Sequence, residues 1–351
     1  MTSAKLPHKP TLADVAKKAG VSTVTVSRMV NRTHKVSEKT QERVNAAMKE
    51  LGYFGNAAAT QLVSGRTKTV GVLTSEVLPY GYASTIEGID RQARIRGFSV
   101  IISVMDLGSE EGIMRTVASV ASQPLAGVIA IDFDKYAEPL VQELPSYLPV
   151  VTTSGPGRAR SEDYPTVFID DAEGSKELIK YLIELGHATV FIIGQPITDP
   201  DEQRTRGVLE ALAEAHLPTF TPINAQNWTP QAGYEAMREL LDRHGDLVTA
   251  VACGNDDLAL GAIRAANECG LTVPDDISIV GFDNSLVAGY SAPPLTTVNQ
   301  DFEALGRLVF DRLLDLIDDP SKVSLVEKRR SSLVIRSSAA KPSPERGLSL
   351  R

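Results

Sequence analysis

The sequence predicts an α/β protein whose large body holds two doubly wound parallel sheets, one in each of two lobes, behind a small all-helical head. Two observations carry this prediction. From residue 69 onward, apolar strand-like runs alternate with helical stretches in more units than a single sheet of this kind needs. Residues 11–54 instead show three short stretches in which apolar residues recur at helical spacing.

The alternation in the body is regular enough to place its elements. We expect strands at 69–74, 99–104, 127–131, 149–152, 166–169, 190–194, 248–252 and 278–282. We expect helices near 83–96, 109–122, 171–185, 203–215, 230–243 and 256–268. In folds of this kind ligands bind beyond the carboxyl ends of the strands, which in a two-lobed body means between the lobes.

The charge of the chain is unevenly distributed. Residues 1–68 carry twelve Lys and Arg against four acidic residues, although the whole chain has a net charge of −8. A basic head on an acidic body is typical of a module that binds a polyanion, joined to a domain with another partner. The charges alone could equally belong to an ordinary solvated surface. The sequence pattern within the head is therefore needed to distinguish this from a polyanion-binding module.

Composition also indicates the cellular location of the protein and whether it carries disulfides or metals. No apolar run is long enough to cross a bilayer, and residues 1–10, which we expect to be flexible, contain no apolar segment of a secretory signal. Cys253 and Cys269 are the two cysteines, and the five histidines show no metal-ligand spacing. We therefore expect a cytoplasmic protein without disulfides, bound metal or other cofactor.

The head has the pattern of a helix-turn-helix unit. Thr11 and Asp14 form a capping-box-like start, and Gly20 ends the first helix. Ser22 caps a second helix after a short turn, and a third runs from near Ser37 to the glycine at 52. The second helix is rich in hydroxyl side chains and contains one Arg, groups that suit phosphates and base edges. A generic three-helix core is the alternative.

Two stretches of the head carry a resemblance to a known family. "TLADVAKKAGVSTVTVSRMVN" and "VSEKTQERVNAAMKELGY" resemble the head of the lactose repressor family of bacterial transcriptional regulators, and the resemblance continues over nearly the whole chain. It implies that the second helix enters the major groove of operator DNA. The DNA contacts that it implies in the head are Thr11, Leu12, Ser22, Thr23, Val24, Thr25, Ser27, Arg28, Asn31 and Lys35.

Residues 55–68 are interpreted as a hinge helix and linker between the head and the body. The Ala-rich segment 56–64 matches the family's hinge helix, which implies DNA contacts from Asn56, Ala59 and Leu62. By this resemblance Leu62 inserts between base steps in the minor groove, whereas the alternative is that it packs on the body. The family usually has Pro before the hinge Asn, and Gly55 stands there in this chain.

The body resembles periplasmic sugar-binding proteins, whose chain crosses between the lobes three times. The resemblance places lobe one at 69–169 plus 301–327 and lobe two at 170–300 plus 328–340. Palindromic operators require a two-fold protein, so we expect a homodimer. The tail 341–351 contains two prolines and no leucine heptad, so we expect it to be disordered rather than to build a larger assembly.

Several polar residues follow expected strands of the body at positions where a sugar site would lie. Asn255, Asp257, Asp283 and Arg204 offer the donors and acceptors that hydroxyls need, and Trp228 could stack on a sugar ring. Taken singly, each has a plain structural alternative: a helix cap, a surface ion pair or a core aromatic. Together they match the family's effector contacts, which also implies Ser75 and Phe302.

The resemblance favours a neutral sugar effector. The segments "NWTPQAGY", "DDISIVGFDNS" and "PPLTTVNQDFEALG" carry it most strongly, and a galactoside is favoured on that ground. A sugar acid or sugar phosphate bound by Arg204 is the alternative. Asp257 stands where the effector site of the pattern has Gln, and Ser154 stands where it has Asp, so the effector's identity does not carry over.

The sequence fits two other classes of function, an enzyme and a periplasmic sugar-binding protein, less well. An enzyme on a doubly wound scaffold is not supported, because the sequence has no Gly-rich dinucleotide motif after a strand, no P-loop and no nucleophile elbow. A periplasmic sugar-binding protein is disfavoured by the basic head and by the missing signal segment. The sequence thus predicts a sugar-responsive repressor that is not an enzyme.

Overall fold

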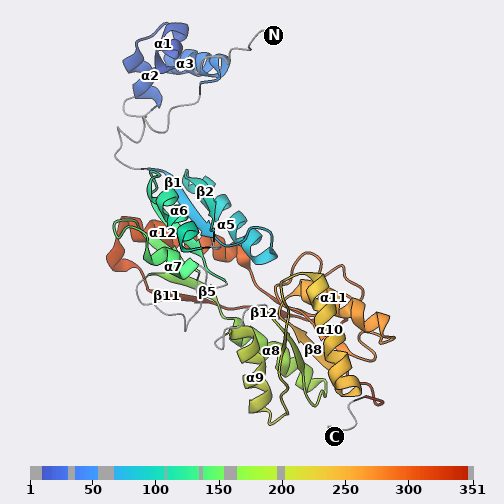
Figure 1. The fold of residues 1–351 in the computed structure, drawn as a ribbon. Helices are drawn as coiled ribbons and strands as arrows, with labels where there is room; N and C mark the ends of the chain where they lie inside the picture. Colours follow the sequence, from blue (N-terminus) through green and yellow to red (C-terminus); the bar gives the residue numbers. More distant parts are fainter. Residues whose placement is uncertain are drawn as a thin grey trace, which may run out of the picture. The chain divides into compact units, whose positions relative to one another are not determined.

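The protein is described from a computed structural model, which covers residues 10–30, 36–53, 67–106, 109–133, 137–153, 164–195 and 202–346. The chain divides into two compact units, residues 1–68 and 69–351, which are treated separately below. Figure 1 shows the helical first unit and the α/β second unit. In the described residues, no helix is both long and apolar enough to cross a membrane.

The head consists of α1 (Leu12–Ala19), α2 (Thr23–Val30) and α3 (Glu38–Leu51). The predicted capping box is present, because the Thr11 backbone N–H donates to the Asp14 carboxylate over 2.8 Å and the Asp14 N–H donates to the Thr11 hydroxyl. Gly20 ends α1 with φ 63°, a conformation that glycine adopts without strain. Val15, Val26 and Val44, one from each helix, are fully buried together.

Lobe one is built on a six-stranded parallel sheet in the order β11-β5-β4-β3-β1-β2. Helices α5 and α12 pack on one face of this sheet, and α6 and α7 pack on the other. Its strands are β1 (Thr69–Thr74), β2 (Ser99–Val104), β3 (Gly127–Ile131), β4 (Val150–Thr152), β5 (Thr166–Ile169) and β11 (Val326–Arg329). Its helices are α5 (Tyr80–Arg96), α6 (Glu110–Ala121), α7 (Ala137–Gln142) and α12 (Phe302–Asp318).

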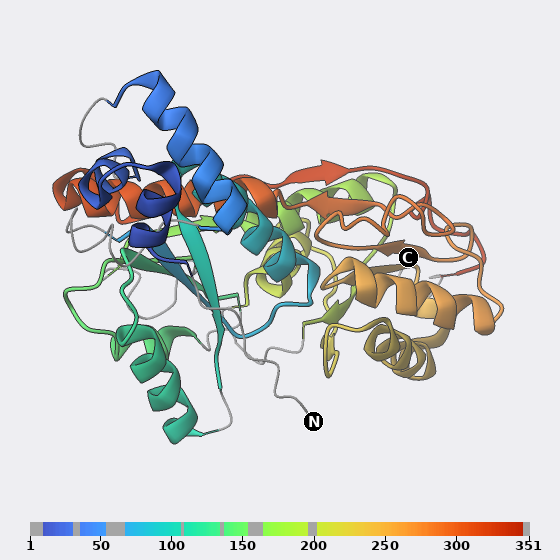
Figure 2. The same ribbon diagram turned by 90° about the horizontal axis from the view of Figure 1, so that it is seen from above.

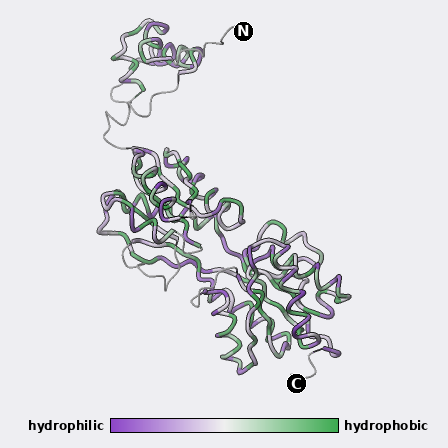
Figure 3. Tube along the Cα trace, viewed as in Figure 1, coloured by the Kyte–Doolittle hydropathy of each residue, from purple (hydrophilic) through white to green (hydrophobic). Residues whose placement is uncertain are grey.

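Lobe two repeats this architecture around a four-stranded parallel sheet in the order β7-β6-β8-β9. Helices α8 and α9 cover one face, and α10 and α11 cover the other. Its strands are β6 (Phe191–Gly194), β7 (Ile223–Asn224), β8 (Ala250–Cys253) and β9 (Ser278–Val280). Its helices are α8 (Asp171–Glu184), α9 (Gln203–Glu214), α10 (Pro230–His244) and α11 (Asp256–Glu268). The two helix-covered parallel sheets and the all-helical head confirm the predicted fold class, and Figure 3 shows the hydropathy of the chain along the same trace.

Three segments join the lobes, after β5, after β10 (Thr297–Asn299) and after β11 (Figures 1 and 2). Strand β10 pairs with β12 (Ser332–Val334) in a short antiparallel sheet, which bridges to β9 through Val280 and Thr296. Strand β11 pairs with β5 as far as Arg329, so the expected end of lobe one at residue 327 falls inside a strand. The lobe boundary therefore lies just after this strand.

Each lobe contains a pair of helices in unusually close contact. A Cβ added at Gly306 of α12 would lie 2.2 Å from the Thr85 carbonyl oxygen of α5. In lobe two, a Cβ at Gly261 of α11 would lie 1.8 Å from the Pro230 oxygen at the start of α10. Only glycine allows such an approach of two backbones, so these residues set how the helices pack on each sheet.

The C-terminal segment corrects one expectation. Residues 341–346, which we expected to be disordered, follow a defined path along lobe two, where Arg346 Nη2 donates to the Gly245 carbonyl over 2.9 Å and pairs with Asp246. Just before them, buried His187 lies 3.0 Å from the Ala340 carbonyl, and burial lowers the pKa of His187 to about 4. A neutral imidazole therefore anchors this end of the chain. Residues 347–351 lie outside the described part.

Candidate functional site

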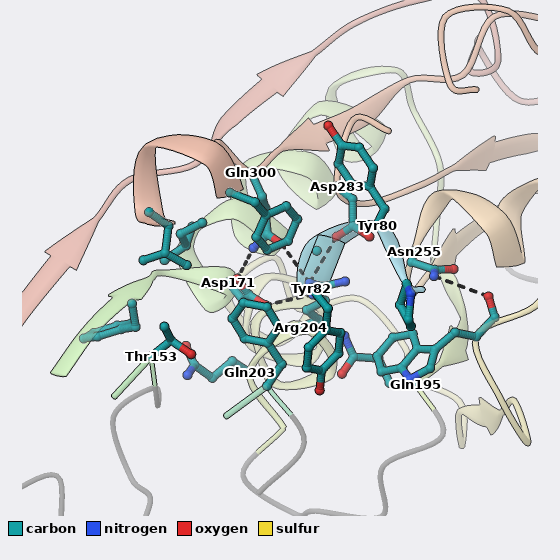
Figure 4. A pocket seen from close by; sticks show the side chains of 18 of the residues that line it. Tyr80, Tyr82, Thr153, Asp171, Gln195, Gln203, Arg204, Asn255, Asp283 and Gln300 are labelled. Carbon is teal, nitrogen blue, oxygen red and sulfur yellow. Dashed lines mark hydrogen bonds and ion pairs between the residues drawn. The ribbon is translucent and has the colours of Figure 1, made fainter. Parts of the chain in front are cut away.

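A pocket lies between the two lobes, where the carboxyl ends of both sheets meet. The hollow encloses about 990 Å³ when the solvent at its open mouth is included. Lobe two and the crossing segments supply mainly polar side chains. Lobe one supplies a group of aromatic rings together with aliphatic residues, Asp132 and Thr153 (Figure 4). The polar lining includes Asp171, Gln195, Glu202, Gln203, Arg204, Asn255, Asp283 and Gln300.

Arg204, near the start of α9, is the centre of the polar wall. Its Nε lies 2.8 Å from the Asp171 carboxylate, and its Nη2 donates to Gln300 Oε1 over 2.8 Å and lies 3.2 Å from Asp283 Oδ1. Its Nη1 donates to the Gly254 carbonyl. Burial by itself would lower the pKa of Arg204, but the Asp171 and Asp283 carboxylates raise it, so the guanidinium is charged at every physiological pH.

Arg204 also links two of the segments that join the lobes. Asp171 begins α8 directly after the first crossing, and Gln300 precedes α12 at the second. The Gln300 amide donates to the other oxygen of Asp171, which closes a triangle of three side chains. Below it, the Arg204 guanidinium carbon lies 4.2 Å from the centre of the Phe282 ring. The network holds the guanidinium in one place.

Asp283 follows β9 in a constrained turn. Its φ is 108° and that of Asn284 is 54°, in a region that non-glycine residues rarely adopt. The Asn284 side chain stabilises this turn by hydrogen bonds with Asn299, over 3.0 Å, and Arg336, over 2.7 Å. Burial raises the pKa of Asp283 well above its usual value, although Arg204 acts in the opposite direction. Strain at a buried acid is typical of functional sites.

Asn255 and Asp256 begin α11 beside this turn. Asn255 is the N-cap, because its Oδ1 accepts from the Leu258 N–H over 2.8 Å, while its Nδ2 lies 3.5 Å from the Trp228 carbonyl. Asn255 therefore has the structural role that was its alternative, a helix cap, and it also lines the pocket. Asp256 is buried behind it and accepts from the Ser285 N–H over 2.6 Å. Burial raises the pKa of Asp256 to about 6.

The lobe-one wall of the pocket is a connected group of aromatic rings. Phe302 lies 6.0 Å from Tyr80 and 5.7 Å from Phe133, measured between ring centres. Tyr82 lies 5.0 Å from Phe133, edge to face. Tyr82 and Phe302 belong to the buried core, whereas Tyr80 and Phe133 are half-buried. This wall therefore offers flat apolar surface on a rigid support.

The structure brings together most of the effector residues that the sequence predicts. Arg204, Trp228, Asn255, Asp283 and Phe302 line the pocket. Two predicted residues do not line it: the Ser75 hydroxyl donates to the Tyr82 hydroxyl over 3.1 Å, and Asp257 is half-buried on α11. Burial raises the pKa of Asp257. Ser154 lies outside the described residues.

Sequence reasoning missed several pocket residues. Asp171 and Gln195 each follow a strand of a sheet, the same signal that identified Asp283, so they could have been found. Phe133 follows β3 in the same way, whereas Tyr80 and Tyr82 carry no such signal, because they reach the pocket through the packing of α5. Among the residues that the structure describes, no cluster of three or more potential metal ligands occurs.

In the head, the predicted DNA-contact residues differ in how freely they are exposed. Thr23, Val24 and Arg28 of α2 are exposed, and Val24 shows 55% of its surface. Ser22 and Thr25 hydrogen-bond each other over 2.9 Å, Ser27 is half-buried, Thr11 caps α1, and Leu12 packs against the head core. Asn31, Lys35, Asn56, Ala59 and Leu62 lie outside the described residues.

Comparison with known proteins links both units to one kind of regulator. Residues 11–56 match the family described as bacterial regulatory proteins, lacI family, and residues 179–339 match the periplasmic binding protein-like domain. The chain is 39% identical over 336 residues to the HTH-type transcriptional repressor PurR of Yersinia pestis (strain Pestoides F), an alignment that covers 91% of this chain and 96% of the relative.

Solved structures agree with this assignment. A lac repressor dimer bound to operator and the anti-inducer ONPF superposes with a TM-score of 0.83 at 30% identity, covering 95% of this chain and all of the other. The transcriptional regulator CelR in complex with cellobiose superposes with a TM-score of 0.71 at 32% identity, over 94% of this chain and all of the other. The similarity therefore spans the head and both lobes.

Proposed function

The chain belongs to the lacI family of bacterial regulatory proteins, and we propose that it represses carbohydrate-utilisation genes until a small neutral sugar binds between its lobes. It is a DNA-binding transcriptional repressor with an effector-binding body, and not an enzyme. The proposal concerns the kind of effector, the genes and the direction of the response. A galactoside is the favoured sugar, and the cytoplasm is the proposed location.

The observation that supports a neutral effector is that the Arg204 side chain already has hydrogen-bond and charge partners. Its guanidinium already has carboxylate partners in Asp171 and Asp283, and amide and carbonyl partners in Gln300 and Gly254. It is the one cationic side chain among the described residues that line the pocket, against four acidic ones: Asp132, Asp171, Glu202 and Asp283. An anionic ligand would meet net negative charge without a cation to pair with.

The hydrogen-bonding groups that remain favour a ligand rich in donors. Gln203 Oε1 and Asp283 Oδ1 are buried oxygens without a hydrogen-bond partner among the described residues, although Asp283 Oδ1 forms an ion pair with Arg204. Both are acceptors, so they favour hydroxyl donors over the acceptor oxygens of a phosphate or carboxylate. Asn255 adds a donor and Trp228 a ring on which a pyranose can stack.

The choice of a galactoside rests on resemblance. The segments around Trp228 and from Asp275 to Gly306 resemble the lactose repressor, and a similar structure is that repressor bound to ONPG in its repressed state, at 31% identity and a TM-score of 0.81. A sugar acid or phosphate remains the second candidate, because Arg204 could pair with it if the ligand displaced Asp171.

For operator binding we propose that α2 reads the major groove, with Val24 against a thymine methyl, and that Leu62 of the hinge enters the minor groove.

A two-fold operator needs two copies of the chain. Exposed apolar residues on both lobes support a homodimer: Ile101, Ile102 and Val104 on the edge strand β2, and Leu286 and Tyr290 in lobe two. Rearrangement of the lobes by sugar would separate the paired hinges.

The direct test combines an operator selection with calorimetry on the full-length protein. The selected operator should be palindromic, and galactosides should bind the body and weaken operator binding. The lactose operator recovered unchanged would contradict the proposed role of Val24. Tight binding of gluconate or a sugar phosphate, with no response to galactosides, would overturn the neutral-sugar proposal.

A further inference from the structure

The turn that carries Asp283 is strained and depends on its surroundings. Asp283 and Asn284 have φ angles of 108° and 54°, which non-glycine backbone keeps only where neighbouring groups hold it. All three backbone N–H groups of the turn 283–285 donate hydrogen bonds. The Asp283 N–H donates to the Val298 carbonyl of β10 over 2.9 Å. The other two N–H groups are bound by side chains, which shows where the turn is anchored.

Two buried side chains hold these remaining N–H groups. The Ser285 N–H donates to Asp256 Oδ2 over 2.6 Å, and the Asn284 N–H donates to Thr297 Oγ1 over 3.3 Å. The Thr297 hydroxyl in turn donates to Asp256 Oδ1 over 2.6 Å. Asp256 is 1% exposed and Thr297 is fully buried. One carboxylate therefore anchors two consecutive residues of the turn, one directly and one through a hydroxyl.

The chain just after β9 leaves room for this carboxylate. A Cβ added at Gly281 would lie 2.3 Å from Asp256 Oδ1. The φ of Gly281 lies outside the left-handed region, so its backbone conformation does not itself require glycine. The missing side chain at this position therefore lets the Asp256 carboxylate reach the turn.

We propose that Asp256 and Thr297 are positioning residues of the effector site. They hold the turn 283–285 in its strained conformation and so keep the Asp283 carboxylate beside Arg204. Neither residue lines the pocket, so both act through Asp283, whose Oδ1 lies 3.2 Å from Arg204 Nη2. A group that is fixed before the ligand arrives does not have to be ordered during binding. This inference rests on the proposed function, because it takes Asp283 as a group that binds the effector.

The alternative is that Asp256 acts through its charge. Burial is the largest cause of the raised pKa of Asp283, and the Asp256 charge raises it further. Thr297 separates the two explanations, because its hydroxyl is uncharged and bonds the turn. At pH 8, above the pKa of Asp256, which is about 6, the Asp256 carboxylate is ionised. A loss of affinity on removal of the Thr297 hydroxyl at that pH therefore reports positioning.

The test makes two measurements on full-length variants at pH 8, calorimetry with methyl β-galactoside and amide hydrogen exchange of the turn. Thr297→Val keeps the size of the side chain but removes its hydroxyl. We expect this variant to bind the sugar about tenfold more weakly, because a buried hydrogen-bonding group loses its partner. Exchange at Asn284 and Ser285 should become about tenfold faster. Asp256→Ala removes the whole anchor and should change both measurements at least as much.

Two further variants separate positioning from a general loss of stability. Thr297→Ser restores the hydroxyl and should rescue both measurements to within about twofold. Thr189→Val is the matched control, because Thr189 is also buried in lobe two, donates to the Pro218 carbonyl over 2.6 Å and does not line the pocket. It should lower stability without changing sugar affinity or exchange at the turn.

The outcomes distinguish this inference from the proposed function. Unchanged sugar affinity in Thr297→Val would overturn the positioning role and leave the proposed function standing, whether or not exchange at the turn becomes faster. A loss of affinity in Asp256→Ala alone would assign the effect to charge and also overturn it. If methyl β-galactoside does not bind the unmodified protein, the favoured sugar is wrong, and hydrogen exchange in Thr297→Val and Thr297→Ser decides whether the two side chains hold the turn.

Discussion

The two lobes have the same architecture but present opposite chemistry to the pocket. In each, a parallel sheet is covered on both faces, and a pair of helices is brought together at glycines such as Gly306 and Gly261. Lobe two places Asn255 and Asp283 just after its strands, with Arg204 between them. At the corresponding edge, lobe one places Phe133 after β3, with Tyr80 at the start of α5.

The difference suggests that the two lobes have different roles in binding a ligand. The polar groups of lobe two are held by one another and by the crossing segments, so they define where and how a ligand's hydroxyls bind. The rings of lobe one are continuous with its core, so they define the shape and apolar extent of the remainder. Since a ligand in the pocket contacts both lobes, it favours one relative arrangement of the lobes, which is the basis of allosteric control.

The largest effect should come from removing the charge at the centre of lobe two's wall. Arg204→Met leaves the Asp171 and Asp283 carboxylates buried without a cation, which should cost about 3–5 kcal/mol of unfolding free energy. Sugar binding should also be lost. Urea unfolding measures the first effect. Lys176→Met, which breaks the surface pair with Glu210, is the control and should cost less than about 1 kcal/mol.

A second effect concerns pH and again belongs to lobe two. The folded-state pKa of Asp256 is about 6, because burial disfavours its charge. A carboxyl with a raised pKa binds more protons when folded, so its contribution is complete below its unfolded pKa and is lost as pH rises through 6. Between about pH 4 and 7 the protein should lose about 2.5 kcal/mol relative to Asp256→Asn.

Unfolding measured across that pH range in both proteins tests Asp256 together with its coupling to Asp283. The Asp283 carboxyl remains in both proteins, and burial is the largest cause of its raised pKa, with the Asp256 charge a smaller one. Parallel stability curves for the two proteins would show that Asp256 titrates normally, and the buried-acid description of this wall would then be wrong.

The third prediction tests whether the lobes share their packing while differing in function. Gly306→Ala and Gly261→Ala should each destabilise the body by about 1–3 kcal/mol, because a Cβ would overlap backbone of the neighbouring helix. Thermal unfolding of both variants measures this. If either variant is as stable as the unmodified protein, close backbone contact does not set the packing of that helix pair.

The smallest effect should come from Ser75, which the sequence predicted as an effector contact. Ser75 does not line the pocket and its hydroxyl donates to the Tyr82 hydroxyl, so Ser75→Ala should leave sugar affinity within about twofold. Calorimetry with the sugar that binds best decides between the two interpretations. A tenfold or greater loss would restore Ser75 to the site.

The sequence predicted the strands of the body well, because parallel strands buried on both faces read as continuous apolar runs. Strands 69–74, 127–131 and 166–169 occur as expected and fit this description. The expected strand 99–104 also occurs, but it is a largely exposed edge strand. Helix α12 was not predicted, although Leu305, Val309 and Leu313 recur at helical spacing. The pairing of β11 with β5 could not be predicted, because strand pairing between distant segments leaves no local signal.

The site was predictable to the extent that it follows the ends of strands. Asn255 and Asp283 were found by that signal, and Arg204 was found at the start of a helix. Of the aromatic wall, the resemblance supplied Phe302. Tyr80 was not found, because it meets Phe302 only through tertiary packing, and Phe133 was not singled out although it follows β3. The prediction therefore described one wall of the pocket and missed most of the other.

The central claim is that a neutral sugar bound between the lobes weakens operator binding. The most direct measurement determines operator affinity with and without saturating sugar, and sugar affinity with and without operator, on the full-length protein at one salt concentration. Linkage requires the two factors to be equal, and couplings of this kind are typically about 5- to 150-fold. Equal factors in that range, each a weakening, are the predicted result. Operator affinity that is unchanged or increased by saturating sugar would contradict the account.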